Sequence, residues 1–205
     1  MRNLFAMDYP PDDLEHGTFS VGFHPYNIGK ADEEDVLKKV RLATENLRVL
    51  AVGEIGLDKS LDIPMETQMR IFKAQVEIAE LTDLPVILHV VRAFNEIIEF
   101  MNSHKPSVPM IIHGYNGGRQ MAEDLVKAGF FLSFGEAITG EHSKIVEALL
   151  AVPTDHIFLE TDEGDMDIRE IYSMAAAIKG MSEEALREQV LENARTQISR
   201  FHENN

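Results

Sequence analysis

Cysteine is missing from all 205 residues of this sequence. The chain therefore has no disulfide framework and no thiolate to offer a metal ion, which fits a cytoplasmic protein. Long apolar runs are missing too. None approaches the ~18 residues that span a membrane, and the N-terminal residues lack the apolar core of a signal peptide. We therefore predict a cytoplasmic location and no membrane partner.

Basic residues are scarce. Lys and Arg total 19 against 35 Asp and Glu, which gives a formal net charge of −16. A chain this acidic repels phosphate backbones at long range. No dense basic patch interrupts the acidic pattern. Binding to nucleic acid is therefore expected to be weak, unless a bound metal reverses the local charge.

The chain alternates short apolar runs with amphipathic helical patterns. The runs stop at polar or charged residues and read FSVGFHP, VLAVGE, LPVILH, VPMIIH, GFFLSFGE and DHIFLETD, with NLFAMDY as a further early strand. Helical periodicity marks residues 66–81, 94–104, 118–129, 140–152 and 182–201. In the last of these, Ser182 is the expected N-cap, and Leu186, Val190 and Ala194 share one face.

This alternation predicts an α/β fold of parallel strands. Polar residues at the strand ends are typical of a (β/α) barrel, whose chemistry lies at the C-terminal ends of its strands. An open doubly wound sheet is the alternative, but the glycine-rich loop it usually carries is absent. We count six or seven strands where a barrel has eight, so we predict one short barrel domain over residues 1–205. An incomplete barrel exposes strand edges, which favours a homodimer.

Four strand-end residues are of types that bind divalent metals: Glu54, His89, His113 and Asp162. A buried carboxylate such as Glu54 costs several kcal/mol unless something pairs with it, and a cation would do so. Taken singly, each residue has an ordinary alternative as a core, salt-bridge or capping residue. Coincidence is much less probable for four such residues at four separate strand ends.

Two further residues are candidates for substrate binding. Arg92, three positions after His89, has the planar fork that suits an anionic group. Its alternative is a solvated arginine in the first turn of a helix. His24, which precedes a proline, suits contact with substrate, phosphate or metal, and its alternative is a turn histidine.

These motifs resemble the TatD family of metal-dependent hydrolases, also called TatD-like deoxyribonucleases. VGFHPYN resembles the family's G-x-H-P motif, AVGEIGLD its G-E-x-G-L-D, and LPVILHVVRA its P-V-x-x-H segment. IIHGYNGG resembles I-H-x-F/Y-x-G, and IFLETDEG resembles L-x-E-T-D. The closing LENARTQISRF is similar to the family's last helix. The motifs follow the family's order over roughly residues 19–201.

The resemblance implies a distorted TIM barrel that hydrolyses phosphoester bonds, typically in DNA. It implies one or two divalent ions (Mg, Mn, Zn or Ni), with Glu54, His89, His113 and Asp162 as ligands. Glu54 and Asp162 would also serve catalysis, and His24 would be a substrate or supporting histidine.

Two departures from the family stand out. The H-x-H motif of the family's first strand is absent, so we expect that strand to be missing. The arginine after His89 comes one residue later than in the family's usual H-x-R.

Three functions follow from these observations. The first is a phosphodiesterase or deoxyribonuclease that uses metal-activated water on DNA or a small phosphoester. The second is a hydrolase of small esters or amides, which the negative charge favours. The third is a catalytically impaired metal-binding relic, which the absent H-x-H favours.

Overall fold

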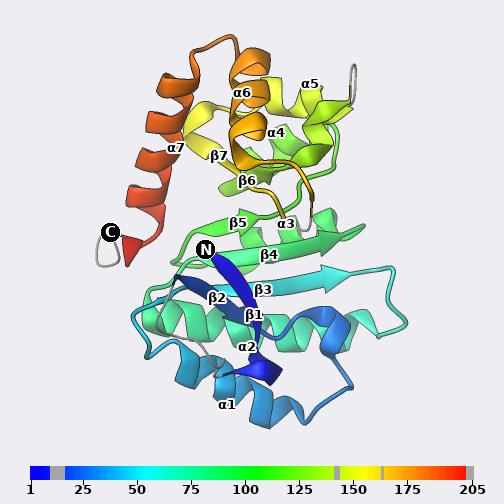
Figure 1. Ribbon diagram of the computed structural model, residues 1–205. Helices are drawn as coiled ribbons and strands as arrows, with labels where there is room; N and C mark the ends of the chain where they lie inside the picture. The colour runs from blue at the N-terminus through cyan, green and yellow to red at the C-terminus, as the bar shows by residue number, and fades with distance from the viewer. Residues whose placement is uncertain (10–16, 141–143, 163, 202–205) are drawn as a thin grey trace. The chain divides into compact units, whose positions relative to one another are not determined.

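The computed structural model describes residues 1–9, 17–140, 144–162 and 164–201. The chain falls into two compact units. The first comprises Met1–Met110 with Gln197–Asn205, and the second comprises Ile111–Thr196. Parallel strands alternate with helices in both units, which confirms the predicted α/β class (Figure 1). The single domain expected over residues 1–205 stays a prediction.

Four parallel strands form the sheet of the first unit, each paired with the next along the chain. They are β1 (Arg2–Phe5), β2 (Phe19–Gly22), β3 (Val49–Asp58) and β4 (Val86–Val91). Short 3-10 turns follow the first two strands, η1 (Ala6–Asp8) and η2 (Pro25–Asn27). β3 is buried along almost its whole length, as its continuous apolar run predicts.

The structure refines the expectation of a missing first strand. β1 lies before β2 and pairs with it in parallel, from Arg2 opposite Phe19 to Phe5 opposite Gly22. Its side chains are largely exposed, so its sequence carries only a weak strand signal. β1 contains no histidine, so the H-x-H side chains are absent although a strand is present.

Three helices belong to the first unit: α1 (Glu33–Ala43), α2 (Met65–Thr82) and α3 (Phe94–His104). α1 and α2 run along the same side of the β1–β4 sheet (Figure 1). α2 and α3 match predicted helices, whereas α1 was not predicted. Its signals are the N-cap of Asp32, which accepts the Asp35 N–H at 2.8 Å, and three buried apolar residues among many charges.

Two buried glutamines of α2 hold the sheet in place. Gln75 accepts the Phe23 N–H at 2.7 Å and donates to the Phe23 carbonyl at 3.1 Å. Gln68 does the same for Asp58, at 2.7 and 2.9 Å. Each amide satisfies both backbone groups of a residue at or just after a strand end. α2 therefore fixes the ends of β2 and β3, where the candidate site lies.

The second unit contains three strands: β5 (Met110–Ile112, whose first residue belongs to the first unit), β6 (Phe130–Phe134) and β7 (Ile157–Leu159). Its helical elements are α4 (Arg119–Lys127), η3 (Glu136–Thr139), α5 (Lys144–Ala151), η4 (Thr154–His156), α6 (Ile168–Lys179) and α7 (Glu183–Gln197). β6 and β7 pair in parallel, with Leu132 opposite Ile157. The described residues thus form seven strands, one fewer than a complete eight-stranded barrel.

The structure confirms the N-cap and the apolar face that the sequence predicts for the last described helix, α7. The Ser182 hydroxyl accepts the Ala185 N–H at 3.2 Å, as an N-cap does. Leu186, Val190 and Ala194 are buried. Asn193, also buried, donates to the carbonyls of Thr154 and Ile157 at 2.9 and 2.8 Å. The predicted apolar face and an internal asparagine together fix α7 against the start of β7.

Two cations close helix ends. The Lys179 ammonium donates to the carbonyls of Leu149, Leu150 and Val152 at 2.6–3.2 Å, where α5 ends. Arg200 donates to the carbonyls of Thr44, Asn46 and Val49 at 2.8–3.2 Å, beyond the end of α1. Carbonyls left over at a helix end attract positive charge. Both contacts therefore stabilise their own units.

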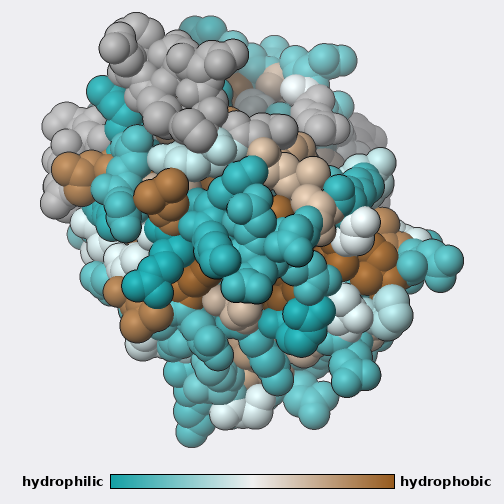
Figure 2. All heavy atoms as spheres, turned by 90° about the horizontal axis from the view of Figure 1, so that it is seen from below, coloured by the Kyte–Doolittle hydropathy of each residue, from teal (hydrophilic) through white to brown (hydrophobic). Residues whose placement is uncertain are grey.

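The surface agrees with the acidic composition. Figure 2 views the face that carries α1 and α2, and it is mostly hydrophilic with scattered apolar side chains. Exposed leucines such as Leu42, Leu47 and Leu81 are spread singly along this unit. Among the described residues, no helix is long and apolar enough to cross a membrane.

Candidate metal centre

Glu54 lies at a bulge in β3. The register passes from Val52 opposite Val86 to Ile55 opposite Leu88, so two residues of β3 face one of β4. The Glu54 N–H donates to the Asn3 side chain on β1 at 2.9 Å. The sequence predicted that this strand ends at Glu54, but it continues to Asp58. The bulge sets the orientation of the half-buried Glu54 carboxylate within the strand. The apolar sequence of the strand gives no sign of this bulge.

The glycine before Glu54 is required for this arrangement. A Cβ on Gly53 would lie 2.6 Å from the Ile87 Cβ and 2.8 Å from its carbonyl oxygen. Glycine alone lets the two backbones approach this closely. In the G-E pair of the motif, Gly53 is thus required for steric reasons, and Glu54 supplies the carboxylate.

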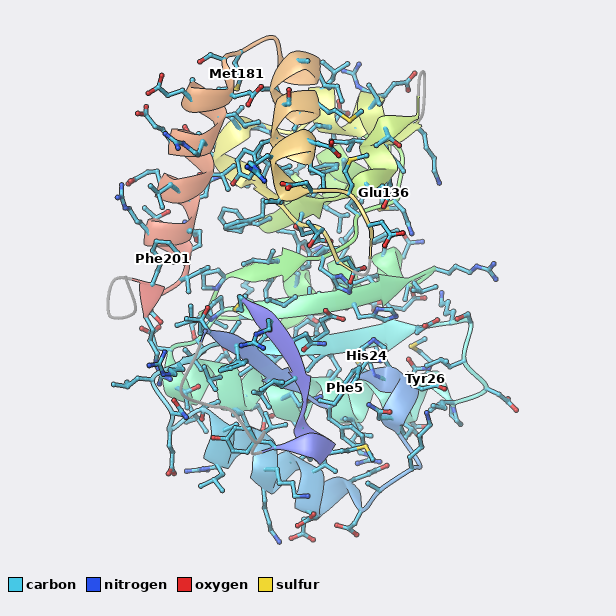
Figure 3. All side chains as sticks on the ribbon, in the orientation of Figure 1. Phe5, His24, Tyr26, Glu136, Met181 and Phe201 are labelled. Carbon is cyan, nitrogen blue, oxygen red and sulfur yellow. The ribbon has the colours of Figure 1, made fainter. Side chains whose placement is uncertain are left out.

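His24 follows β2 and begins the short turn η2. Its Nδ1 accepts the Tyr26 N–H at 3.1 Å, and its carbonyl accepts the Asn27 N–H at 2.9 Å. The Phe5 ring packs edge-on against it, with ring centroids 6.0 Å apart. Figure 3 shows Phe5, His24 and Tyr26 gathered at one end of the first unit's sheet.

His89 lies inside β4 and is held by a carboxylate. Its Nε2 is 3.1 Å from Oδ2 of Asp58, which is buried at the end of β3. The Asp58 Oδ1 accepts the backbone N–H and the hydroxyl of Ser60 at 2.7 and 2.5 Å. Burial alone would raise the pKa of Asp58, but the hydrogen bonds from Ser60 and His89 lower it below its usual value. Asp58 is therefore an anion that orients the His89 ring.

His24, Glu54 and His89 converge. One ring nitrogen of each histidine and one carboxylate oxygen of Glu54 lie within 4.8 Å of one another, and all three residues are half-buried. The two imidazole rings pack with centroids 4.3 Å apart. Imidazole nitrogen with carboxylate oxygen suits Zn, Mn, Fe or Ni. The residues present thus fit a divalent cation.

The other two predicted ligands belong to the second unit. His113 directly follows β5, and its Nδ1 is 3.8 Å from Oε1 of Glu160. Glu160 directly follows β7 and accepts the Gly114 N–H and the Ser133 hydroxyl, both at 2.5 Å. One carboxylate thus joins the ends of three strands and lies beside His113. The sequence marked Glu160 and Ser133 as strand-end residues but assigned them no role.

Asp162 and Arg92 share an unusual backbone conformation. Asp162, three residues beyond β7, has φ 48°, and Arg92, directly after β4, has φ 54°. Both side chains are exposed. Residues other than glycine rarely adopt positive φ, and those that do are found at helix C-termini and at functional sites. Neither residue ends a described helix, whereas Asp83 and Lys105, which share the conformation, cap α2 and α3.

Asp58 and Asn3 are the participants that sequence reasoning missed. Asp58 stands four residues after Glu54 within the same motif, and its role needs the strand to continue past Glu54. Asn3 lies in β1, where it accepts both the Glu54 N–H and the Ser20 hydroxyl, the latter at 3.3 Å. Only knowledge of the β1–β3 arrangement reveals that contact.

Parallel βα units with carboxylate and imidazole donors at their strands define a class of α/β proteins suited to hold a metal ion. Comparison with known proteins assigns the family. The model of the TatD related DNase family matches residues 14–199, and the chain belongs to this family. Its fold is accordingly the distorted (β/α) barrel type that the motifs predicted.

Individual proteins similar to this chain are consistent with the family match. The uncharacterized metal-dependent hydrolase YjjV of Escherichia coli K12 is 33% identical over 153 residues, which are 73% of this chain and 59% of YjjV. The 3'-5' ssDNA/RNA exonuclease TatD of Erwinia billingiae is 29% identical over 197 residues, 86% of this chain and 75% of the exonuclease. The crystal structure of YjjV superposes with a TM-score of 0.81 at 27% identity, over 89% of this chain and 76% of YjjV. The chain spans less than two thirds of YjjV in the sequence match.

Proposed function

We propose that this chain is a metal-dependent hydrolase that cleaves phosphodiester bonds by metal-activated water. The observation that carries the proposal is the convergence of His24, Glu54 and His89 in a chain of the TatD family. The Erwinia relative's name adds support for a nucleic-acid substrate. DNA or a small phosphoester is therefore the proposed substrate, and a cytoplasmic location stays a prediction.

The roles of the residues follow from their chemistry. Glu54 and His89 bind the cation, and Asp58 holds the His89 ring. His113 and Asp162 stay the further ligands that the sequence resemblance predicts, with Asp162 assisting the water. Arg92 binds a non-bridging phosphate oxygen through its guanidinium. A bound divalent ion supplies Lewis acidity and activates water near neutral pH.

The test is metal content. Protein purified without chelator should contain one or two equivalents of Zn, Mn, Fe or Ni by elemental analysis. Glu54→Ala should lose most of this metal and the hydrolysis of bis-p-nitrophenyl phosphate. Glu66→Ala, an exposed acid in the first turn of α2, is the matched control and should keep both. Full activity in a folded Glu54→Ala variant would contradict the proposal.

A small ester or amide is the second candidate substrate, and the net charge of −16 favours it. A panel of p-nitrophenyl esters and lactones beside bis-p-nitrophenyl phosphate separates the two. A higher kcat/KM on the neutral esters than on bis-p-nitrophenyl phosphate would favour a carboxylic ester as the substrate in place of the phosphodiester. Absence of metal after incubation with excess Mn or Zn would favour the impaired relic, in keeping with a β1 that lacks histidine.

A further inference from the structure

The segment that carries Arg92 is tied to the end of β3 at two points, one on each side of Arg92. Before Arg92, the Val91 carbonyl accepts the Lys59 N–H at 3.0 Å. After it, Oε1 of Glu96 accepts a hydrogen bond from the Lys59 ammonium at 2.6 Å. Lys59 directly follows β3, and Glu96 lies in the first turn of α3. A single lysine therefore holds the chain on both sides of Arg92, with its backbone and with its side chain.

Both ends of this contact are anchored in the core. The backbone N–H and carbonyl of Asp58, the residue before Lys59, bond to the buried amide of Gln68 at 2.7 and 2.9 Å. Ala93, the residue after Arg92, is fully buried where α3 begins. Arg92 itself has an exposed side chain and φ 54°. Its neighbours thus hold its backbone in the left-handed conformation, which sets the direction in which its side chain leaves the chain.

The ion pair between Lys59 and Glu96 contributes little to stability. The two side chains are 41% and 29% exposed, so water screens their attraction, and such pairs stabilise a fold weakly. The other Glu96 oxygen, Oε2, is buried and has no hydrogen-bond partner in the part of the chain that the structure describes, which is unfavourable. The Lys59 ammonium nevertheless holds the pKa of Glu96 below its usual value, so the carboxylate is ionised at neutral pH. The pair therefore needs an explanation other than stability, and its place around Arg92 supplies one.

We propose that Lys59 and Glu96 are positioning residues, whose ion pair fixes the segment of Arg92 so that the guanidinium is presented to an anionic group of the substrate. An arginine on a fixed backbone loses less conformational freedom on binding than one on a loose segment, so it binds more tightly. Neither Lys59 nor Glu96 has to touch the substrate for this effect. The inference rests on the proposed function, in which Arg92 binds a phosphate oxygen.

Steady-state kinetics separate positioning from a simple effect of charge. Lys59→Met and Glu96→Met each break the ion pair and keep an unbranched side chain. Both should raise the KM for bis-p-nitrophenyl phosphate about 3- to 10-fold at nearly unchanged kcat. If charge alone mattered, loss of the acid at Glu96 would instead lower the KM for this anionic substrate. Lys73→Met and Glu99→Met, at exposed positions of α2 and α3, are the matched controls and should keep the wild-type KM.

A double-substitution cycle ties the effect to Arg92. Once Arg92→Gln has removed the guanidinium, Lys59→Met should raise the KM no further, because the two residues act through one contact with the substrate. An undiminished additional rise in the double variant would overturn the inference. Shifts of KM in opposite directions in Lys59→Met and Glu96→Met would overturn it too.

NMR relaxation tests the positioning without any turnover. In ¹⁵N-labelled protein free of metal, the order parameter of the Arg92 backbone N–H should be about 0.85 in wild type and should fall toward about 0.6 in Lys59→Met and Glu96→Met. Lys73→Met should match wild type. Equal order in all four proteins would overturn the inference. Failure of a metal-loaded wild-type protein to hydrolyse bis-p-nitrophenyl phosphate would instead overturn the proposed function, since the order of Arg92 is measured without metal or substrate.

Discussion

At the scale of single residues, the candidate centre depends on groups that orient other groups. Asp58 fixes the tautomer of His89, Tyr26 fixes that of His24, and Asn3 holds the backbone of Glu54 at the bulge. None of these three supporting residues is itself a predicted ligand. Substitutions next to the ligands should therefore change metal binding without removing a ligand.

Asp58→Asn tests this dependence. Asparagine keeps the shape but removes the charge that holds the Nε2 proton of His89, so zinc affinity should weaken roughly tenfold or more. Isothermal titration with zinc measures it, and circular dichroism monitors the fold. Asp62→Asn, an exposed acid four residues later, is the control and should bind zinc like the wild type. Equal zinc affinities in all three proteins would show that Asp58 does not support metal binding.

Arg92→Gly tests whether the left-handed backbone at Arg92 serves function. Glycine adopts φ 54° without strain, so the free energy of unfolding should stay within about 1 kcal/mol of wild type or rise. Turnover of bis-p-nitrophenyl phosphate should fall because the guanidinium is lost. Arg92→Lys keeps both strain and charge and should be intermediate in turnover. A large loss of stability in Arg92→Gly would show that Arg92 is structural.

At the scale of secondary-structure elements, the helices brace the strand ends that carry the chemistry. α2 does so through Gln68 and Gln75, each bonded to both backbone groups of one residue. Phe23, held by Gln75, directly precedes His24. The stability of the first unit and the position of His24 should therefore change together.

Gln75→Leu removes one of these braces. The buried N–H and carbonyl of Phe23 lose their partner, which costs about 2–4 kcal/mol of unfolding free energy. Urea unfolding measures the loss. Gln120→Leu, an exposed glutamine on α4, is the matched control and should change stability by less than about 0.5 kcal/mol. A similar effect of both substitutions would show that the contact between Gln75 and the Phe23 backbone contributes little to stability.

Glu80 joins the end of α2 to the segment after α3 and gives a pH dependence. Its carboxylate accepts the Ser107 N–H at 2.9 Å and lies 3.2 Å from Nε2 of His104. Burial alone would raise the pKa of Glu80, but these hydrogen bonds lower it below the usual 4.5. Because the folded pKa is the lower one, the stabilisation is present above pH 4.5 and is lost as the pH falls through the folded pKa.

Glu80→Gln should therefore flatten the acid limb of the stability curve. Unfolding free energy measured between neutral pH and about pH 3 should fall less steeply in the variant than in wild type. Glu77→Gln, an exposed residue of the same helix, should keep the wild-type slope. Parallel curves for all three proteins would contradict the role of Glu80.

Sequence reasoning reached the elements with strong periodicity and missed those without it. α2 and α7 were predicted because their apolar stripes are long, whereas α1 has three buried apolar residues among acids and bases. Glu54 and His89 were found because an apolar run stops at each of them, although β3 and β4 both continue past these residues. Asp58 and the bulge were missed because both depend on how β3 pairs with β4, and pairing is absent from a single sequence.

At the scale of the whole molecule, the net charge of −16 acts on any polyanionic substrate. Raising ionic strength from 0.01 to 0.15 M shortens the Debye length from about 30 to 8 Å and screens the repulsion. Turnover of a single-stranded oligonucleotide should therefore rise over this range, while turnover of a neutral p-nitrophenyl ester should not change. A steady fall in oligonucleotide turnover with salt would indicate an attractive surface instead.

The contact made by Arg200 has a consequence for folding during synthesis on the ribosome. The first unit is assembled from residues 1–110 and from the segment that begins at Gln197, and Arg200 donates to three of its carbonyls. A ribosome adding about 5–20 residues per second needs several seconds to pass from one part to the other. Throughout that interval residues 1–110 lack the segment that begins at Gln197, and the Arg200 contacts form only after the whole of α7 has been synthesised.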